Sequence, residues 1–255
     1  MRRAAVLMVV LCLVVPAEAA QPQFWKLEGA RDFLDGDTEG LSIDSEGRMR
    51  LAPALSLAQD PEAPTVWTLA GRGDRLVAGT GNDGKVFRVG GDKPAAIFDA
   101  AELEVHALAF GKEGRLFAGT GPDGKVYAID GEGRSATFFD PTDKYIWAMA
   151  TADDGRLLVA TGAEGRIHRV DDKGGAEVLF TGPEAHVTAL ATDGSGHIYA
   201  GTSPGGIVYR IDRAGKAFVL HDSSYREVKA LAVGKDGSVY AAVIEGRDRD
   251  DRLGA

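Results

Sequence analysis

The sequence has little of several features that would define other classes of protein. Cys12 is the one cysteine among 255 residues, which excludes a disulfide scaffold. The uncharged apolar run Ala4–Val15 is too short to cross a bilayer, and no repeated long runs suggest a polytopic membrane protein. Basic residues interleave with acids, and the formal net charge is −9, so we expect no binding to nucleic acid.

Glycine, in contrast, is abundant. The chain has 34 glycines, about 13% of its residues, against a usual share of roughly 7%. Glycine inside a helix costs about 1 kcal/mol relative to alanine, so this composition argues against a mainly helical domain. With 44% hydrophobic residues the chain can still bury a core, and we expect an all-β fold.

The N-terminus has the pattern of a secretory signal peptide. Arg2 and Arg3 precede the apolar run, and Pro16 ends it before the small-x-small sequence Ala17-Glu18-Ala19. We predict a signal peptide at residues 1–19 and a periplasmic or extracellular protein of net charge −10, with no stable membrane insertion after cleavage. An uncleaved membrane anchor is the alternative.

One segment recurs along the chain, and it predicts the fold. A strand of the type Val-x-Ala-Leu-Ala occurs five times, at a nearly constant interval of about 40 residues, as in a repeat protein. The copies begin at Val66, Val105, Ile146, Val187 and Val228. After each copy come a polar turn and a second strand, such as Leu116–Thr120, that is apolar on both faces and needs cover on both.

In the first four copies, a second turn follows the second strand and is followed by a third and a fourth strand. It reads Gly81-Asn82-Asp83-Gly84 in the first copy, and Asx-Gly pairs supply the positive-φ positions of hairpin turns. Four short strands joined by hairpins in about 41 residues are typical of one blade of a β-propeller. A parallel β-solenoid is the competing architecture, but its turns are shorter and it lacks this hairpin order.

The repeat resembles those of secreted bacterial β-propellers with WD-repeat-like, NHL-like or YVTN-like repeats. The resemblance rests on Gly-Thr-Gly-x-Asp-Gly-Lys-Val-Tyr/Phe followed by a Val/Ile-Asp ending, and it extends from Val66 to about Val243. No Trp-Asp closes a third strand and no Gly-His opens a blade, unlike true WD repeats. The resemblance implies a binding scaffold in most cases, and a lactonase or lyase in a minority.

The two ends of the repeat region predict an incomplete ring of about five blades. Residues 20–65 form an N-terminal segment with an expected β-hairpin near 41–51, and the propeller repeats occupy 66–255. The fifth repeat has two strands and then an acidic and basic stretch from Glu245 that matches no third strand. We expect an open ring, as in a piece of a six- to eight-bladed propeller. A five-bladed ring closed by strands from both ends is the alternative.

Most candidate chemistry in the chain has a structural explanation. The glycine-rich turn at residues 79–84 resembles a phosphate loop, but it recurs between strands, which favours a hairpin turn. Asp83, Asp123 and Glu164 give one carboxylate per turn, too few for calcium. The five histidines show no metal-ligand spacing, and no serine lies in a Gly-x-Ser-x-Gly elbow. We therefore expect no cofactor, no bound metal and no enzymatic activity.

One position changes chemical type between copies while its neighbours stay constant. It is the second residue of each innermost strand: Trp67, His106, Trp147, Thr188 and Lys229. This variation indicates that packing between repeats does not determine the residue type at this position. We expect the position to lie at one end of the propeller, nearest the axis, where its side chains could contact a ligand by stacking and cation–π interaction. The alternative is that the two tryptophans wedge between blades and serve packing alone.

These observations predict an exported, non-catalytic scaffold that binds an unidentified protein, peptide or glycan at the axial face. The first alternative is a metal-dependent lactonase or lyase, in which Glu104, Glu184 or Glu227 would hold a divalent ion. The second alternative is a periplasmic sensor or assembly module of a longer protein.

Overall fold

The computed structural model describes residues 38–44, 46–53, 56–90 and 93–245. The chain divides into two compact units, Met1–Ser56 and Leu57–Ala255. In the first unit, β1 (Leu41–Ile43) and β2 (Met49–Leu51) pair as an antiparallel hairpin. The predicted signal peptide at 1–19 lies outside the described residues. In the described ranges, no helix has the length and apolar character needed to cross a membrane.

The second unit consists of antiparallel sheets, each built from strands consecutive in the chain. Blade 1 contains β3 (Thr65–Arg72), β4 (Arg75–Gly81), β5 (Lys85–Val89) and β6 (Ala95–Asp99). Blade 2 contains β7 (Glu104–Phe110), β8 (Leu116–Gly121), β9 (Val126–Ile129) and β10 (Ser135–Phe139), with a 3-10 turn, η1 (Lys112–Gly114), between β7 and β8. Blade 3 contains β11 (Tyr145–Thr151), β12 (Leu157–Gly162), β13 (Arg166–Val170) and β14 (Ala176–Thr181). Blade 4 contains β15 (His186–Thr192), β16 (Ile198–Ser203), β17 (Ile207–Ile211) and β18 (Ala217–Asp222), and blade 5 contains β19 (Glu227–Val233) and β20 (Val239–Ile244).

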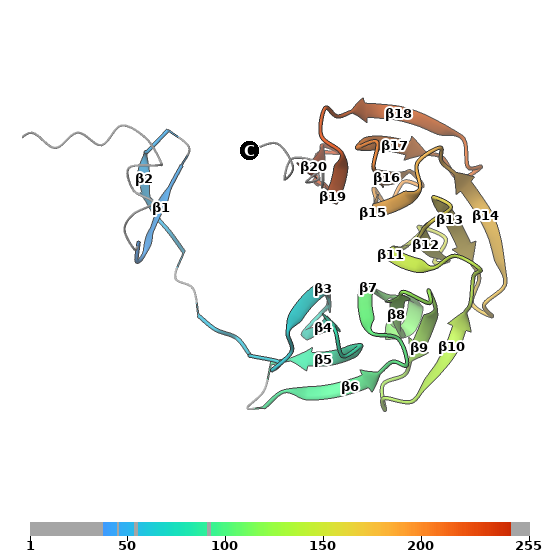
Figure 1. Ribbon diagram of the computed structural model, residues 1–255, viewed down its shortest axis with the longest axis horizontal. Coiled ribbons are helices and arrows are strands. Elements are labelled where there is room, and N and C mark those ends of the chain that lie inside the picture. The colour runs from blue at the N-terminus through green and yellow to red at the C-terminus, as the bar shows by residue number, and fades with distance from the viewer. Residues whose placement is uncertain (1–37, 45, 54–55, 91–92, 246–255) are drawn as a thin grey trace, which may run out of the picture. The chain divides into compact units, whose positions relative to one another are not determined.

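The blades lie side by side in an open arc around a common centre (Figure 1). The first strand of each blade faces the centre, and the fourth strands β6, β10, β14 and β18 form the outer edge. Among the described strands, none pairs blade 1 with blade 5. The predicted all-β propeller with an open ring is therefore confirmed, with four complete blades and two strands of a fifth.

The second strands of the middle blades are buried on both faces, as their sequences predict. Every residue of β8 and every residue of β12 is buried, because the neighbouring blades cover both sides of the sheet. At the end of the arc β20 is largely exposed, and Tyr240 and Ile244 show 61% and 44% of their surface.

Adjacent blades interlock through an aliphatic side chain that faces a small residue. Val105, Ile146, Val187 and Val228, one in each of blades 2 to 5, are all 0% exposed. A Cβ added at Gly79 would lie 2.8 Å from a methyl group of Val105, and one added at Gly119 would lie 2.5 Å from a methyl group of Ile146. Because the glycine of one blade has no side chain, the aliphatic residue of the next blade fits against it. Val66, the copy in blade 1, meets no preceding blade among the described residues and is 43% exposed.

The repeated Gly-Thr-Gly sequence forms the hairpin between the second and third strands. Thr80 is fully buried, donates a hydrogen bond from Oγ1 to the carbonyl of Lys85 (3.0 Å) and accepts one from its N–H (3.1 Å). Asn82 and Gly84 have φ of 65° and 61°, the left-handed region that these residues tolerate best. The glycine-rich segment is therefore a hairpin turn between β4 and β5, as predicted.

In the loops before blades 2, 3 and 4, an acidic residue binds the third-strand region of the blade that follows, through hydrogen bonds that recur along the arc. Glu102 accepts hydrogen bonds from Lys125 Nζ (2.8 Å) and Tyr127 Oη (3.0 Å). In the next repeat, Asp143 accepts from Arg166 (3.0 Å) and lies 2.8 Å from Nε2 of His168. His168 can replace the tyrosine of the other copies because it meets the same kind of partner, a buried carboxylate.

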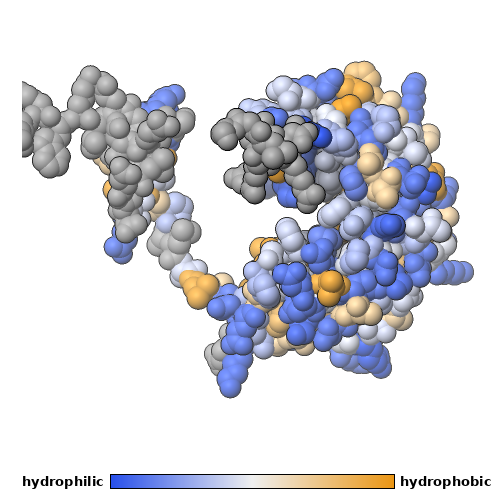
Figure 2. All heavy atoms as spheres, in the orientation of Figure 1, coloured by the Kyte–Doolittle hydropathy of each residue, from blue (hydrophilic) through white to orange (hydrophobic). Residues whose placement is uncertain are grey.

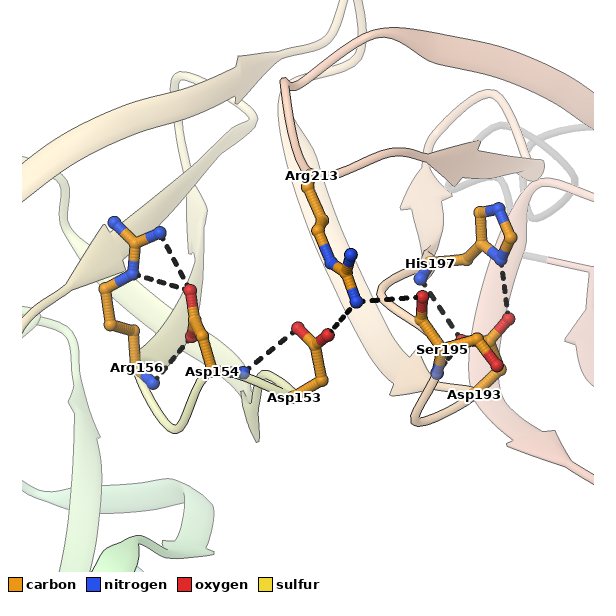
Figure 3. A network of polar contacts seen from close by, with 7 residues as sticks. All are labelled: Asp153, Asp154, Arg156, Asp193, Ser195, His197 and Arg213. Atoms are coloured by element: carbon orange, nitrogen blue, oxygen red, sulfur yellow. Dashed lines mark hydrogen bonds and ion pairs between the residues drawn. The ribbon is translucent and has the colours of Figure 1, made fainter.

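A second polar network joins blades 3 and 4 at the opposite end of their innermost strands (Figure 3). Arg213, which follows β17, donates to the side chain of Asp153 and to the carbonyl of Ser195 (3.1 Å). Asp193 accepts the N–H groups of Ser195 and His197 and orders the turn between β15 and β16. These contacts hold the blades at one end of the axis and leave the other end to the variable positions.

The interlock predicts the effect of filling one glycine. In Gly119→Ala the new methyl group would overlap the side chain of Ile146, and overpacking of this kind destabilises by about 1–3 kcal/mol. Urea denaturation should therefore show a lower free energy of unfolding than for the unchanged protein.

The chain itself provides the matched control. At the same place in blade 3 it has Ala160, packed in one cluster with Val187 of blade 4. Adding Ile146→Val to Gly119→Ala recreates that pair and should restore most of the lost stability. Equal stability of Gly119→Ala and the unchanged protein would contradict the interlock, and Gly131→Ala, which meets nothing within 4 Å, serves as a neutral reference.

Candidate functional site

The variable position of each innermost strand is a β-bulge in all five blades. Val66 pairs with Thr80 and Thr68 with Gly79, so Trp67 between them has no partner in the ladder. The same shift occurs between Val105 and Ala107 and at the corresponding place in blades 3, 4 and 5. A bulge residue is extra to the pairing and leaves the pleat of the strand. This is the physical reason that the repeat does not fix its chemical type.

The five bulge residues surround one cavity. Its volume is about 760 Å³, and its lining includes all five predicted site residues: Trp67, His106, Trp147, Thr188 and Lys229. Side chains from the register position two residues earlier line the same cavity: Glu104, His186 and Glu227. In the space-filling view the body of the blades is hollowed between the two ends of the arc, while mostly hydrophilic side chains cover its outside (Figure 2). The topology therefore brings together one position from every repeat, although these positions lie far apart in the sequence.

Aromatic rings form a continuous wall on one side of this cavity. The ring centroids of Trp67 and His106 are 5.4 Å apart, and those of His106 and Trp147 are 4.7 Å apart. Tyr145 stacks on Trp147 at 4.9 Å with an interplanar angle of 13°. Trp67 keeps 46% of its surface exposed, so its ring contacts a neighbouring blade and remains open to a ligand. Packing between blades and exposure to the cavity are thus combined in the same side chains.

A hydrogen bond between blades fixes Trp147. Its Nε1 donates to Nδ1 of His186 at 3.0 Å, and the backbone N–H of Ala163 approaches the same nitrogen at 3.4 Å. Because the indole nitrogen is only a donor, Nδ1 of His186 must be unprotonated. Burial lowers the pKa of His186 below its ordinary value of 6.5, partly offset by the charge of Glu227. The imidazole is therefore neutral at pH 7 and holds the indole in place.

Charged groups line the same cavity as the aromatic wall. Oε2 of Glu104 lies 2.8 Å from Nε2 of His106, a buried atom that has no hydrogen bond of good geometry. Burial, together with the positive charge of Lys229, lowers the pKa of His106 despite the neighbouring Glu104. In blade 5, Nζ of Lys229 lies 3.0 Å from Oε1 of Glu227.

Thr188 differs from the other four bulge residues. Its hydroxyl donates a hydrogen bond to the carbonyl of Val228 at 2.7 Å, which joins blades 4 and 5. Thr188 lines the cavity, but its polar side-chain atom is already occupied within the protein.

Glycines at the end of the second strands make room for the aromatic side chains. A Cβ at Gly81 would lie 2.1 Å from Nε1 of Trp67, and one at Gly162 would lie 2.3 Å from Nε1 of Trp147. In blade 4, where the bulge residue is the small Thr188, Ser203 takes the place of the glycine. A large bulge side chain thus faces a glycine on the second strand, whereas the small Thr188 faces a residue that has a side chain. These glycines were not predicted as part of the site, because glycine was attributed to composition and turns, although the correlation between copies is visible in the sequence.

Two histidines lie together at the cavity, since His106 and His186 both contact Trp147. One expectation needs correction. Glu184 was grouped with Glu104 and Glu227, but its carboxylate accepts a hydrogen bond from Tyr209 Oη (3.3 Å) instead of lining the cavity. The error is one of register, since Glu184 is a copy of Glu102 and Asp143.

Among the residues that the structure describes, no group of three or more His, Cys, Asp or Glu side chains could hold a metal ion.

The contact of Trp147 with Gly162 yields a prediction. In Gly162→Ala the methyl group would occupy the position of the indole nitrogen and displace the ring from His186. The fluorescence emission of Trp147 should shift to longer wavelength, because the displaced ring meets more water. Gly131→Ala, with open space around the new methyl, should leave the spectrum unchanged, and an unchanged spectrum of Gly162→Ala would contradict the proposed contact.

The hydrogen bond between Trp147 and His186 also predicts a pH dependence. As the pH falls through the folded-state pKa of His186, Nδ1 gains a proton and can no longer accept from the indole. Since this pKa is lowered, the stability from the neutral imidazole is present above pH 6.5 and is lost as the pH falls below that value.

Proton NMR measures this directly. The indole N–H resonance of Trp147, assigned by its loss in Trp147→Phe, should shift with a midpoint below 6.5 that coincides with the titration of His186. A midpoint above 6.5, or an indole signal that does not respond, would contradict the assigned hydrogen bond.

No protein-family model matches the sequence, and no curated protein matches it. Solved structures do match, and they are propellers. The structure of a catalytically inactive virginiamycin B lyase from Staphylococcus aureus with quinupristin has a TM-score of 0.62 and 13% identity, over 80% of this chain and 70% of the lyase. The WD40 β-propeller domain of Doa1 has a TM-score of 0.57 and 16% identity, over 70% of this chain and 60% of that one.

A putative gluconolactonase gives a similar result, with a TM-score of 0.56 and 15% identity over 80% of this chain and 77% of its own. A lyase, a putative gluconolactonase and a WD40 domain are thus all similar to this chain, and identities at this level show the fold alone. Together with the observed blades, they show that the chain has the β-propeller fold.

Proposed function

We propose that the protein is an exported, non-catalytic scaffold that binds a ligand or partner in the cavity at the axial end of its blades. The observation that carries the proposal is the gathering of all five bulge residues around this one cavity. These residues have no partner in the strand ladders, so the fold does not need their particular chemistry. Their variation then serves contact with something outside the chain.

The cavity has the properties of a binding site. About 760 Å³ is within the usual range for ligand pockets, and an aromatic wall beside a few polar groups is the usual composition of such pockets. The wall is also preorganised, since Trp147 is held by Tyr145 and His186 before any ligand arrives. A rigid aromatic surface binds with little loss of conformational entropy.

Tryptophan fluorescence tests the proposal. In a screen of short peptides and oligosaccharides, a ligand should change the emission of the unchanged protein. Trp147→Ala should weaken its binding about tenfold or more, as expected for an aromatic hot spot. Phe218→Ala is the matched control, because Phe218 is 59% exposed on β18 and does not line the cavity. A ligand bound equally well by Trp147→Ala would contradict the proposed site.

Metal analysis of the purified protein distinguishes the enzymatic alternative from the binding scaffold. A lactonase or lyase that uses Glu104 or Glu227 as a ligand requires a divalent ion. A stoichiometric ion in the purified protein, lost on substitution of both glutamates, would favour the enzyme over the scaffold.

A further inference from the structure

The charges of the cavity are unequal, and this inequality points to a class of ligand. Its lining carries two carboxylates, Glu104 and Glu227, and one ammonium group, Lys229. Lys229 and Glu227 lie 3.0 Å apart and neutralise one another. Among the described residues that line the cavity, no second cation compensates Glu104, because burial keeps the adjacent His106 neutral. The cavity therefore carries one uncompensated negative charge.

The middle ring of the aromatic wall lies next to that charge. His106 is in contact with Glu104 on one side and lies between Trp67 and Trp147 on the other. The faces of tryptophan rings attract cations, most strongly where little water competes. A carboxylate beside an exposed indole face is a suitable arrangement for a planar guanidinium group, which can stack on the ring and donate to the carboxylate at the same time.

The opposite charge is less well accommodated. An anionic ligand would have to approach Glu104 and compete with Glu227 for Lys229, and the chain as a whole carries a formal net charge of −9. The long-range field of the protein and the local charge of the cavity thus favour a cation.

We propose that the cavity binds a cationic group, the guanidinium of an arginine in a basic peptide, stacked on the wall of Trp67 and Trp147 and paired with Glu104. This inference rests on the proposed function, since it assumes that the cavity is the binding site. It adds the chemistry of the ligand and names Glu104 as the residue that determines specificity.

Three peptides that differ at one residue test the inference. Acetyl-Gly-Arg-Gly-amide is compared with its citrulline counterpart, which has the same shape and no charge, and with its glutamate counterpart, by saturation-transfer NMR and tryptophan fluorescence. The arginine peptide should bind about tenfold more tightly than the citrulline peptide, and added salt should weaken it. The glutamate peptide should bind least.

Two variants assign the specificity to one side chain. Glu104→Gln should remove the preference for arginine over citrulline, because the charged carboxylate that distinguishes the two peptides is gone. Glu113→Gln, on the exposed η1 turn outside the cavity, is the matched control and should bind like the unchanged protein. Thermal melting of both variants confirms that they are folded.

The outcomes separate this inference from the proposed function. Equal binding of the arginine and citrulline peptides, a preference for glutamate, no binding of any peptide, or an arginine preference that survives Glu104→Gln overturns the cationic assignment. If a neutral oligosaccharide then binds in a Trp147-dependent way, the cavity remains the binding site and only its ligand class changes. Arginine binding that Trp147→Ala leaves intact contradicts the proposed site itself.

Discussion

Much of this structure depends on one contact between blades, in which an aliphatic side chain packs against a glycine of the preceding blade. Val105, Ile146 and Val228 are fully buried over Gly79, Gly119 and Gly201. Each such side chain contributes about 1.5–3 kcal/mol by leaving water, and no single blade can supply the cover by itself. The interlock places the next residue of every innermost strand at the same depth beside the axis. A constraint on stability thus generates a ring of equivalent positions.

The β-bulge allows the side chains at those equivalent positions to differ, and they can therefore form a site. A regularly paired residue would have to fit the pleat, and its side chain would be selected for the contact between blades. The bulge residue escapes this requirement, as the series Trp67, His106, Trp147, Thr188 and Lys229 shows. The surrounding contacts still orient it, because Trp147 is held by His186 of the next blade. The fold thus combines chemical freedom at one position with rigid placement of that position.

The repeat period and the turn sequences were enough to predict the blades, their open arrangement and the variable position, because all three follow from comparison of the copies. The bulge was not predictable from any single copy, since Val66-Trp67-Thr68 reads as ordinary alternation. The contacts of Trp147 with His106 and His186 join residues that lie one repeat apart, and only the packing of the blades reveals them. The misplacement of Glu184 has the same cause, because a shift of two residues separates the carboxylates that bind the third-strand region from those that line the cavity.

The most direct test of this account is a nuclear Overhauser experiment on the rings of Trp147, His106 and His186. The account places the His106 and Trp147 centroids 4.7 Å apart and the Trp147 and His186 centroids 5.8 Å apart, each pair on different blades. It therefore predicts cross-peaks from the Trp147 ring protons to both imidazoles, lost in Trp147→Ala. A Trp147 ring that shows cross-peaks only to its own blade would contradict the stacking of blades around a shared cavity.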